Sequence, residues 1–405
     1  MPAKNFKSKF ILKSLLLLFS VAGSSCQQQL YTKTFTVENK LAMARKAETV
    51  SVPVSQVSKM VEKFGAGNVV IREAASKQAL VTQPLDVDMD GKADEILFQT
   101  DINPNEKKKF TIEGLENGAA LQPKPKLTTY SRFVPERTDD YTWENDRVAF
   151  RTYGPVAQQL AEAGKPDGTL TSGMDAWLKR VEYPVIDKWY KKYTDKTGSY
   201  HNDTGEGYDP YHVGPSRGLG GIGIWKHDKL YVSKNFTGYK TIATGPIRTV
   251  FELTYAPWQA DGVTVTETKR ISLDLGSNLS RHEVRLQSAE PLPDLTIGIT
   301  LHDKKGTVKA NQEQGWFRYW EPMDNSELGT GIVADPAVVK GYTDYRVNAP
   351  DRSHLFVHVN PTNNKVIYYT GFGWKRSGQF TSPEEWDAYL ADFAARIASP
   401  LEVEF

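Results

Sequence analysis

Residues 247–272 read Ile-Arg-Thr-Val-Phe-Glu-Leu-Thr-Tyr-Ala-Pro-Trp-Gln-Ala-Asp-Gly-Val-Thr-Val-Thr-Glu-Thr-Lys-Arg-Ile-Ser. β-Branched and aromatic residues fill 247–256 and 263–272, and the segment between these runs contains Pro257, Asp261 and Gly262. The first kind of residue favours strands and the second favours turns, so this stretch predicts two long strands of antiparallel character.

Runs of the same kind recur along the whole chain, and helical periodicity is scarce. Further strands are predicted at 34–38, 49–53, 68–72, 95–100, 109–112, 147–152, 295–300, 331–333, 355–359 and 365–371. Helices are predicted at 54–62, 177–192 and 383–398, the last with Ser382 as its N-cap. The sequence therefore predicts a mainly β fold: a large antiparallel β supersandwich, similar to the β domains of sugar mutarotases and lyases, with few short helices.

The first 26 residues have the features of a targeting segment, because lysines precede the apolar run 14–22. The apolar run is followed by Gly-Ser-Ser-Cys, and its Cys26 is the only cysteine of the chain. This resembles a bacterial lipoprotein signal, in which Cys26 is acylated and becomes the new N-terminus; the alternative is a cleaved secretory signal. The following Gln-Gln-Gln lacks an acidic surface-export tag, which favours the periplasmic face of the envelope over the cell surface. Residues 27–405 are then predicted to form a single catalytic β-sandwich domain, held at the membrane by its lipid anchor only.

Composition narrows the chemistry that this chain can perform. The formal net charge is +1, which gives no reason to expect nucleic acid as a partner. With Cys26 acylated, disulfides, cysteine catalysis and thiolate metal sites are excluded, so acid/base groups must come from Tyr, His, Lys, Arg and carboxylates. The nine Trp and nineteen Tyr suit sugar faces as well as protein cores.

Residues 200–221 form the segment richest in reactive side chains. They contain six glycines, two prolines and few aliphatic residues. This pattern predicts a long exposed loop that serves a site, the alternative being a plain surface connection. The segment 130–153 is similarly dense in charged and aromatic residues, and we expect the two segments to meet on one concave face.

A third motif spaces four aspartates, Asp86, Asp88, Asp90 and Asp94, around Gly91. The alternation resembles the first part of a calcium loop, but Leu97 stands where an EF-hand has glutamate, and a strand follows. A β-turn that binds a structural Ca²⁺ and a turn that hydrogen-bonds itself are both open. No cofactor is predicted to be required for the chemistry.

Five blocks of this sequence resemble one family: Arg132-Phe-Val-Pro-Glu-Arg137, 143–150, 153–155, the Tyr-His…Gly-Glu-Gly-Tyr-Asp…Tyr-x-Val-Gly loop, and 245–251. It is a lipoprotein family of formerly unknown function from polysaccharide-degradation loci of Bacteroidota, and the similarity runs from about Phe35 to the C-terminus. The family includes an oligosaccharide dehydratase of ulvan breakdown. The resemblance implies elimination of water from a non-reducing terminal uronic acid, which leaves a 4,5-unsaturated sugar for a downstream unsaturated-glucuronyl hydrolase.

Such an elimination needs a base for the C5 proton, an acid for the departing hydroxide and a cation or donors for the C6 carboxylate. Imidazole titrates near neutral pH, a phenol passes protons at close range, and a guanidinium grips both carboxylate oxygens. The candidates for acid and base are His201, His212, Tyr208 and Tyr211. The candidates for substrate binding are Arg217, Arg132, Arg137, Lys179, Trp143 and Trp225.

Two other classes of function stay open on the residues alone. A non-catalytic glycan-binding lipoprotein would explain the anchor and the aromatic residues, but less well the titratable groups of 200–221. A polysaccharide lyase or a sugar epimerase would use the same proton abstraction. Product mass separates these reactions, because dehydration removes one water, lyase cleavage shortens the chain and epimerisation leaves the mass unchanged.

Overall fold

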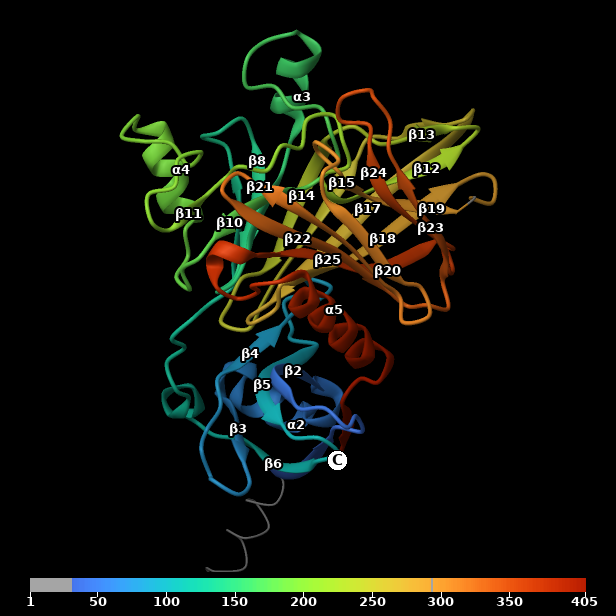
Figure 1. The fold of residues 1–405 in the computed structure, drawn as a ribbon. Helices are drawn as coiled ribbons and strands as arrows, with labels where there is room; N and C mark the ends of the chain where they lie inside the picture. Colours follow the sequence, from blue (N-terminus) through green and yellow to red (C-terminus); the bar gives the residue numbers. More distant parts are fainter. Residues whose placement is uncertain (1–30, 293) are drawn as a thin grey trace, which may run out of the picture.

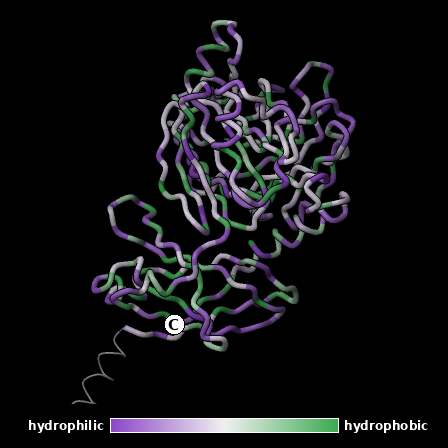
Figure 2. The backbone as a smooth tube through the Cα atoms, turned by 90° about the vertical axis from the view of Figure 1, so that its left-hand side faces the viewer, coloured by the Kyte–Doolittle hydropathy of each residue, from purple (hydrophilic) through white to green (hydrophobic). Residues whose placement is uncertain are grey.

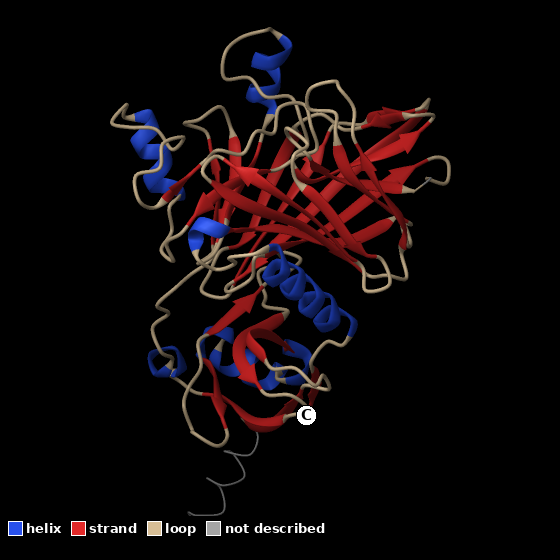
Figure 3. Cartoon of the chain, in the orientation of Figure 1, coloured by secondary structure: helices blue, strands red, loops and turns tan. Residues whose placement is uncertain are grey.

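The computed structural model describes residues 31–292 and 294–405, so Cys26 and the predicted signal segment lie outside the described residues. Strands dominate the fold, and helices lie at its edges and in the gap between two bodies of β structure (Figure 3). The named strands pair antiparallel within five sheets. The predicted fold class, mainly β and antiparallel with few helices, is confirmed.

The smaller body combines the N-terminal strands with the C-terminal end of the chain (Figure 1). One sheet has the order β26 (Glu402–Glu404), β1 (Thr32–Glu38), β6 (Lys107–Gly114) and β3 (Val69–Glu73). The other has the order β2 (Arg45–Pro53), β5 (Glu95–Ile102) and β4 (Thr82–Leu85). Their apolar faces enclose a core around Phe35, Phe98 and Ile112, onto which α2 (Ser58–Phe64) packs through Met60.

The larger body is built on a nine-stranded sheet. Its order is β14 (Phe236–Ala243), β15 (Arg248–Tyr255), β17 (Val263–Asp274), β18 (Leu279–Ser288), β25 (Lys365–Trp374), β22 (Ser326–Ala334), β21 (Trp316–Met323) and β20 (Thr307–Asn311), with β16 (Trp258–Ala260) beside β17. The two strands predicted from 247–272 are β15 and β17, which pair from Arg248↔Asp274 to Thr254↔Thr268. Burial alternates along β17, so every second side chain faces the interior.

Two five-stranded sheets cover the inner face of the nine-stranded sheet. One has the order β11 (Gly207–Tyr208), β10 (Asp175–Lys179), β9 (Ala149–Thr152), β8 (Asp140–Glu144) and β7 (Tyr130–Val134). The other has the order β13 (Lys229–Tyr231), β12 (Leu219–Lys226), β19 (Leu295–Thr300), β24 (His354–Val359) and β23 (Val339–Tyr345). All three sheets contribute to one core, and Figure 2 shows hydrophobic segments inside this body.

The helices match the prediction in part. Helix α5 (Pro383–Ala398) has the predicted bounds, and the Ser382 hydroxyl accepts a hydrogen bond from the Glu385 N–H at 3.3 Å. The helix predicted at 177–192 is wrong in its first half, because Trp177 lies in β10 and α4 (Ile186–Thr194) begins only after Pro184. A proline in that position disfavours helix in the residue before it. Helix α3 (Pro155–Glu162) was not predicted.

The two bodies have separate main cores and meet along α5 (Figure 1) and at a small buried cluster that joins Leu85 and Leu97 to Ile247 and Val250. Helix α5 packs with Trp386 and Leu390 against the outer face of the nine-stranded sheet, and the chain then returns to the smaller body as β26. That residues 27–405 act as a single catalytic domain stays a prediction. Among the described residues, none of the helices combines the length and apolar character needed to cross a bilayer.

Candidate active site

A cavity of about 470 Å³ opens where the two predicted segments meet. Strand β9 supplies Arg151 and the chain just after it Tyr153, the segment after α3 supplies 168–170, and His201 and 209–215 complete the lining. The segments belong to one sheet, since β11 pairs with β10 and β10 with β9. Of the segment 130–153, only Arg151 and Tyr153 line the cavity together with residues of 200–221; that the two segments form one functional face stays a prediction.

The segment 200–221 differs from the predicted exposed loop. Tyr208, Tyr211 and Arg217 are buried, and 219–221 belong to β12. The reason is that both tyrosine rings join the large core, which residue type alone did not reveal. Gly207 is required at this pairing, because it has a φ of 115° and an added Cβ would lie 1.9 Å from the Leu178 carbonyl oxygen.

The imidazole of His201 is oriented by Asp209. Its Nδ1 lies 3.0 Å from the backbone carbonyl oxygen of Asp209 and 3.5 Å from that residue's Oδ2. A carbonyl oxygen only accepts, so Nδ1 carries the proton and Nε2 of the neutral ring carries the lone pair. The side chain is 51% exposed and lines the cavity, which makes Nε2 available as a base.

A cluster of carboxylates surrounds the guanidinium of Arg151 behind this imidazole. Its Nε lies 2.5 Å from Asp175 Oδ2, its Nη2 2.8 Å from Asp209 Oδ2, and its Nη1 3.7 Å from Asp140 Oδ2. Burial raises the pKa of Asp140 to about 6, against the opposing effect of Arg151. Burial and the neighbouring Asp175 also raise the pKa of Asp209 well above its usual range. One cation among three carboxyl groups therefore favours retention of a proton near neutral pH.

Three buried polar atoms at this place have no hydrogen-bond partner among the described residues: Asp175 Oδ1, Asp209 Oδ1 and the Tyr211 hydroxyl. An unpaired buried polar group costs about 1–3 kcal/mol. Asp209 and Tyr211 line the cavity, and Asp175 Oδ2 accepts a hydrogen bond from the Tyr153 hydroxyl at 3.2 Å. Groups of a bound ligand would satisfy such atoms, so this concentration makes the cavity the candidate functional site.

Tyr211 rests against a buried histidine that sequence reasoning missed. The ring of His302 meets the Tyr211 ring edge-on at 4.6 Å, while His302 Nδ1 lies 2.7 Å from Glu321 Oε1 and Nε2 lies 3.0 Å from the His212 carbonyl oxygen. Burial opposes the charge on His302, but Glu321 outweighs it and raises the pKa of the imidazole. Burial raises the pKa of the Tyr211 phenol well above its usual range, so this group remains protonated and can donate.

The other two acid/base candidates lie at the margin. His212 lines the cavity, but its side chain is 67% exposed and its Nε2 lies 3.3 Å from Asp351 Oδ1. The Tyr208 hydroxyl donates to Asp324 Oδ2 at 2.5 Å, and Tyr208 is not among the residues that line the cavity. The structure thus brings His201, Tyr211 and His212 together and leaves Tyr208 apart.

The predicted arginine clamp does not reach this cavity. Arg217 points into the interior and donates to Ser172 Oγ at 2.9 Å and Thr171 Oγ1 at 3.0 Å. Arg132 is paired with Glu136 and Asp187. Arg137 donates to the Tyr200 hydroxyl at 3.1 Å and is paired with Asp167. The cation of the cavity is Arg151, because the alternation of β9 and its pairing with β10 turn that side chain toward Asp175.

The three remaining substrate-binding candidates also lie elsewhere. Lys179 is buried, with Nζ 2.8 Å from Glu144 Oε2, and Trp143 is 0% exposed with its indole N–H on Ser280 Oγ at 2.9 Å, so neither can touch a sugar in this structure. Trp225 lines a second cavity of about 410 Å³ together with Arg217. Pro215 lines both cavities, which places Trp225 beyond the wall of the first.

The aspartate motif forms an exposed turn before β5. One carboxylate oxygen each of Asp86, Asp88 and Asp94 lie within 4.8 Å of one another, a donor set of hard oxygens that suits Ca²⁺. The same turn also hydrogen-bonds itself, since Asp86 accepts from the N–H groups of Met89 and Gly91 at 2.7 and 2.8 Å. Asp90 lies outside the cluster and accepts from the Lys92 N–H. The structural Ca²⁺ remains a proposal for three of the four predicted ligands.

Comparison with known proteins shows the family of this chain. Residues 37–403 match the model of the domain of unknown function DUF4861. The chain belongs to this family. This DUF4861 chain is also 46% identical over 399 residues to the uncharacterized protein P7 of Formosa agariphila, a member of the Bacteroidota, with 97% of this chain and 99% of P7 covered.

Two solved structures have a similar chain course. The first is a protein in glycosyl hydrolase family 38 from Enterococcus faecalis, with a TM-score of 0.50 and 10% identity over 95% of this chain and 50% of that chain. The second is an alpha-mannosidase from Enterococcus faecalis V583, with a TM-score of 0.45 and 9% identity over 93% of this chain and 46% of that chain. The DUF4861 chain spans about half the length of these structures, and the first of them shows a shared fold alone.

Proposed function

We propose that this protein is a carbohydrate-active dehydratase that removes water from the non-reducing terminal uronic acid of ulvan-type oligosaccharides. The observation that supports it most is that one cavity is lined by His201, whose Nδ1 is held by the Asp209 carbonyl oxygen, and by Asp209 and Tyr211, whose Oδ1 and hydroxyl have no partner among the described residues. The resemblance of the sequence blocks to the ulvan dehydratase family supplies the substrate class.

The proposed reaction uses these groups in separate roles. His201 Nε2 takes the C5 proton, and the electron pair of that C–H bond forms the C4=C5 double bond as the C4–O bond breaks. The Tyr211 hydroxyl gives its proton to the departing oxygen, which leaves as water. The protonated carboxyl of Asp209 donates a hydrogen bond to the C6 carboxylate while charge develops on it, as a neutral acid in a buried site can do. His201 then releases its proton to solvent through the open cavity, and the Tyr211 phenolate takes up a proton, which restores the starting state of both side chains.

The product would be a 4,5-unsaturated uronate at the end of an otherwise intact oligosaccharide. An unsaturated-glucuronyl hydrolase is the enzyme class that would consume it. Because the proposed reaction uses only side chains of this chain, no cofactor is proposed for it.

Mass spectrometry of uronate-terminated ulvan oligosaccharides incubated with the protein tests this proposal. We expect loss of one water without shortening, together with the ultraviolet absorbance of a conjugated enoate. A shorter product would instead indicate a polysaccharide lyase, an unchanged mass with altered stereochemistry an epimerase, and binding without any reaction a glycan-binding lipoprotein. Each of these three outcomes would refute dehydration.

We also propose that acylation of Cys26 holds the protein on the periplasmic face of the envelope. A lipid chain tethers a protein but does no chemistry. The Cys26→Ser variant should therefore move from the membrane fraction to the soluble fraction with its turnover intact, and retention of that variant in membranes would contradict the anchor.

A further inference from the structure

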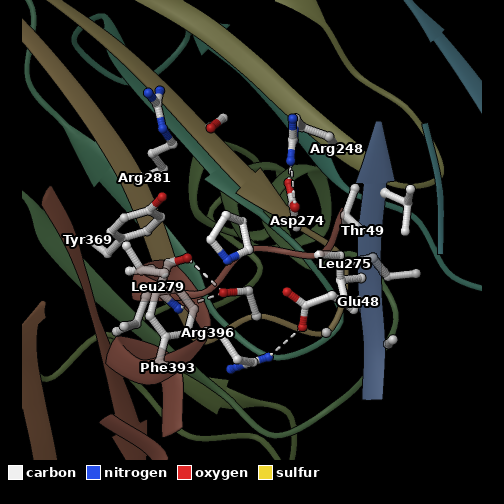
Figure 4. Close-up of a pocket in the computed structure, with 18 of the residues that line it drawn as sticks. Glu48, Thr49, Arg248, Asp274, Leu275, Leu279, Arg281, Tyr369, Phe393 and Arg396 are labelled. Carbon is white, nitrogen blue, oxygen red and sulfur yellow. Dashed lines mark hydrogen bonds and ion pairs between the residues drawn. The ribbon is translucent and has the colours of Figure 1, made fainter. Parts of the chain in front are cut away.

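A cavity of about 410 Å³ lies at the junction of the two bodies, and none of the residues that line it also lines the His201 cavity. Its walls come from β2 of the smaller body, from the outer face of the nine-stranded sheet, and from α5 with the chain that follows it. Figure 4 shows Arg248, Arg281 and Arg396 on different sides of this junction cavity. The proposed reaction uses none of these residues.

Cations outnumber their partners around the junction cavity. Arg248 is balanced by Asp274, with contacts of 2.5 and 2.8 Å. Elsewhere one carboxylate serves two guanidinium groups: Glu283 lies 3.0 Å from Arg281 and 2.7 Å from Arg285. The local positive charge is therefore only partly neutralised.

The same imbalance occurs on the opposite wall. Glu48 lies 3.1 Å from Arg396 and 3.8 Å from Arg45, a side chain with no exposed surface. Arg396 Nε and Arg45 Nη1 are buried and have no hydrogen-bond partner among the described residues. Buried cationic donors without partners are costly, and because Arg396 lines the junction cavity, an oxyanion there would relieve that cost at Arg396.

Aromatic rings form the third feature of this site. Tyr369 of β25 and Phe393 of α5 meet edge-to-face at 5.1 Å, and both line the cavity beside Arg281 and Arg396 (Figure 4). Rings next to cations suit a saccharide that carries an acidic group, because its C–H faces can stack while its oxyanion is held.

We propose that the junction cavity binds the sulfate ester or carboxylate of an acidic saccharide and forms a second carbohydrate site, separate from the His201 cavity. The oxyanion follows from the charges, whereas the saccharide rests on the proposed function. A site of this kind would hold the polymer near the protein while its terminal residue enters the other cavity.

Calorimetric titration of the full mature chain in a His201→Ala background tests the proposal, since we expect that background to lower kcat about 10²–10⁴-fold. The probes are a sulfated ulvan oligosaccharide, the same oligosaccharide after desulfation and carboxyl reduction, and sodium sulfate. We expect the first probe to bind and to weaken with added salt, and Arg281→Gln to lower its affinity about tenfold, as loss of a charged hydrogen bond does. Arg285→Gln is the matched control, because it shares strand β18 and the Glu283 partner but lies outside the cavity.

Equal affinity of the parent and Arg281→Gln for the acidic oligosaccharide would overturn the proposal. So would undiminished binding of the neutral probe, or binding of sodium sulfate without binding of the oligosaccharide. Because binding is measured without turnover, absence of dehydration in the parent would refute the proposed function and leave this result standing.

Discussion

Replacing Tyr211 with phenylalanine separates the effect of its hydroxyl on protein stability from its proposed role in catalysis. The hydroxyl is buried and has no partner among the described residues, whereas the ring packs against His302 at 4.6 Å. Tyr211→Phe keeps the ring and removes the unpaired group. We therefore expect the variant to unfold at the same or a higher temperature than the parent, with a gain of up to about 1–3 kcal/mol.

Tyr319→Phe provides a matched control with the opposite sign. The Tyr319 hydroxyl is also buried, but it donates to the Leu301 carbonyl oxygen at 2.9 Å and accepts from the Gly306 N–H at 3.0 Å. Its removal leaves two backbone groups unpaired, so the free energy of unfolding should fall by about 1–3 kcal/mol. Direct effects on the chemical step are not expected, because Tyr319 does not line the cavity.

Thermal melts measure the effect of each variant on stability, and the enoate absorbance assay measures its effect on turnover. If Tyr211 donates the proton to the departing oxygen, Tyr211→Phe should lower kcat by about 10²–10⁴-fold, or ~3–5 kcal/mol of barrier, while its melting temperature does not fall. A variant that melts early, as Tyr319→Phe should, would show that the Tyr211 hydroxyl has a structural partner. Retained turnover would exclude this phenol as the acid.

Three further predictions concern other groups. His201→Ala should lower kcat by about 10²–10⁴-fold. His212→Ala should lower kcat by less than about tenfold, because the His212 imidazole is mostly exposed. A larger loss in His212→Ala than in His201→Ala would exclude His201 as the base. The pKa of Asp140 is raised to about 6, so its share of stability is present below about pH 4 and is lost, by about 3 kcal/mol in total, as the pH rises from about 4 to about 6. Asp140→Asn should therefore flatten the melting temperature between about pH 4 and 6, and an unchanged slope in that range would contradict this. Calcium should raise the melting temperature of the parent and of Asp90→Ala but not of Asp88→Ala, and equal responses of all three would argue against the ion.

Strands with β-branched runs could be predicted from the sequence, and strands without them could not. The run 295–300 coincides with β19, and 263–272 lies within β17. In contrast, β12 contains Gly220, Gly221 and Gly223, a composition typical of a loop. These glycines are buried in the strand because neighbouring groups pack closely against the backbone there. Strand β18 alternates charged and apolar residues and lacks a β-branched run, so its place at the centre of the sheet was not visible.

The site was found in outline because its residue types are concentrated in two segments, and it was missed in detail because ion pairs depend on contacts between distant strands. Arg151 meets Asp175 and Asp209 only through the register of β9 with β10. His302 and Glu321 come from about a hundred residues farther along the chain, and no local pattern linked them to Tyr211. The two arginines of 130–137 were plausible by type, yet acidic neighbours neutralise both of them.

The two cavities carry opposite charge, and this difference bears on how an acidic polymer would be handled. Arg151 stands among three carboxyl groups at the His201 cavity, of which Asp209 lines it, while two arginines that line the junction cavity share their carboxylates with arginines outside it. An anionic chain is attracted to the junction at long range and accepted by the His201 cavity only when the carboxyl cluster holds a proton. The raised pKa of Asp209 supplies that proton near neutral pH. Under the proposed function, the junction cavity attracts the anionic polymer and the His201 cavity performs the chemistry. The two tasks are separate because a strongly basic catalytic cavity would ionise the Asp209 carboxyl, which must stay protonated to donate a hydrogen bond.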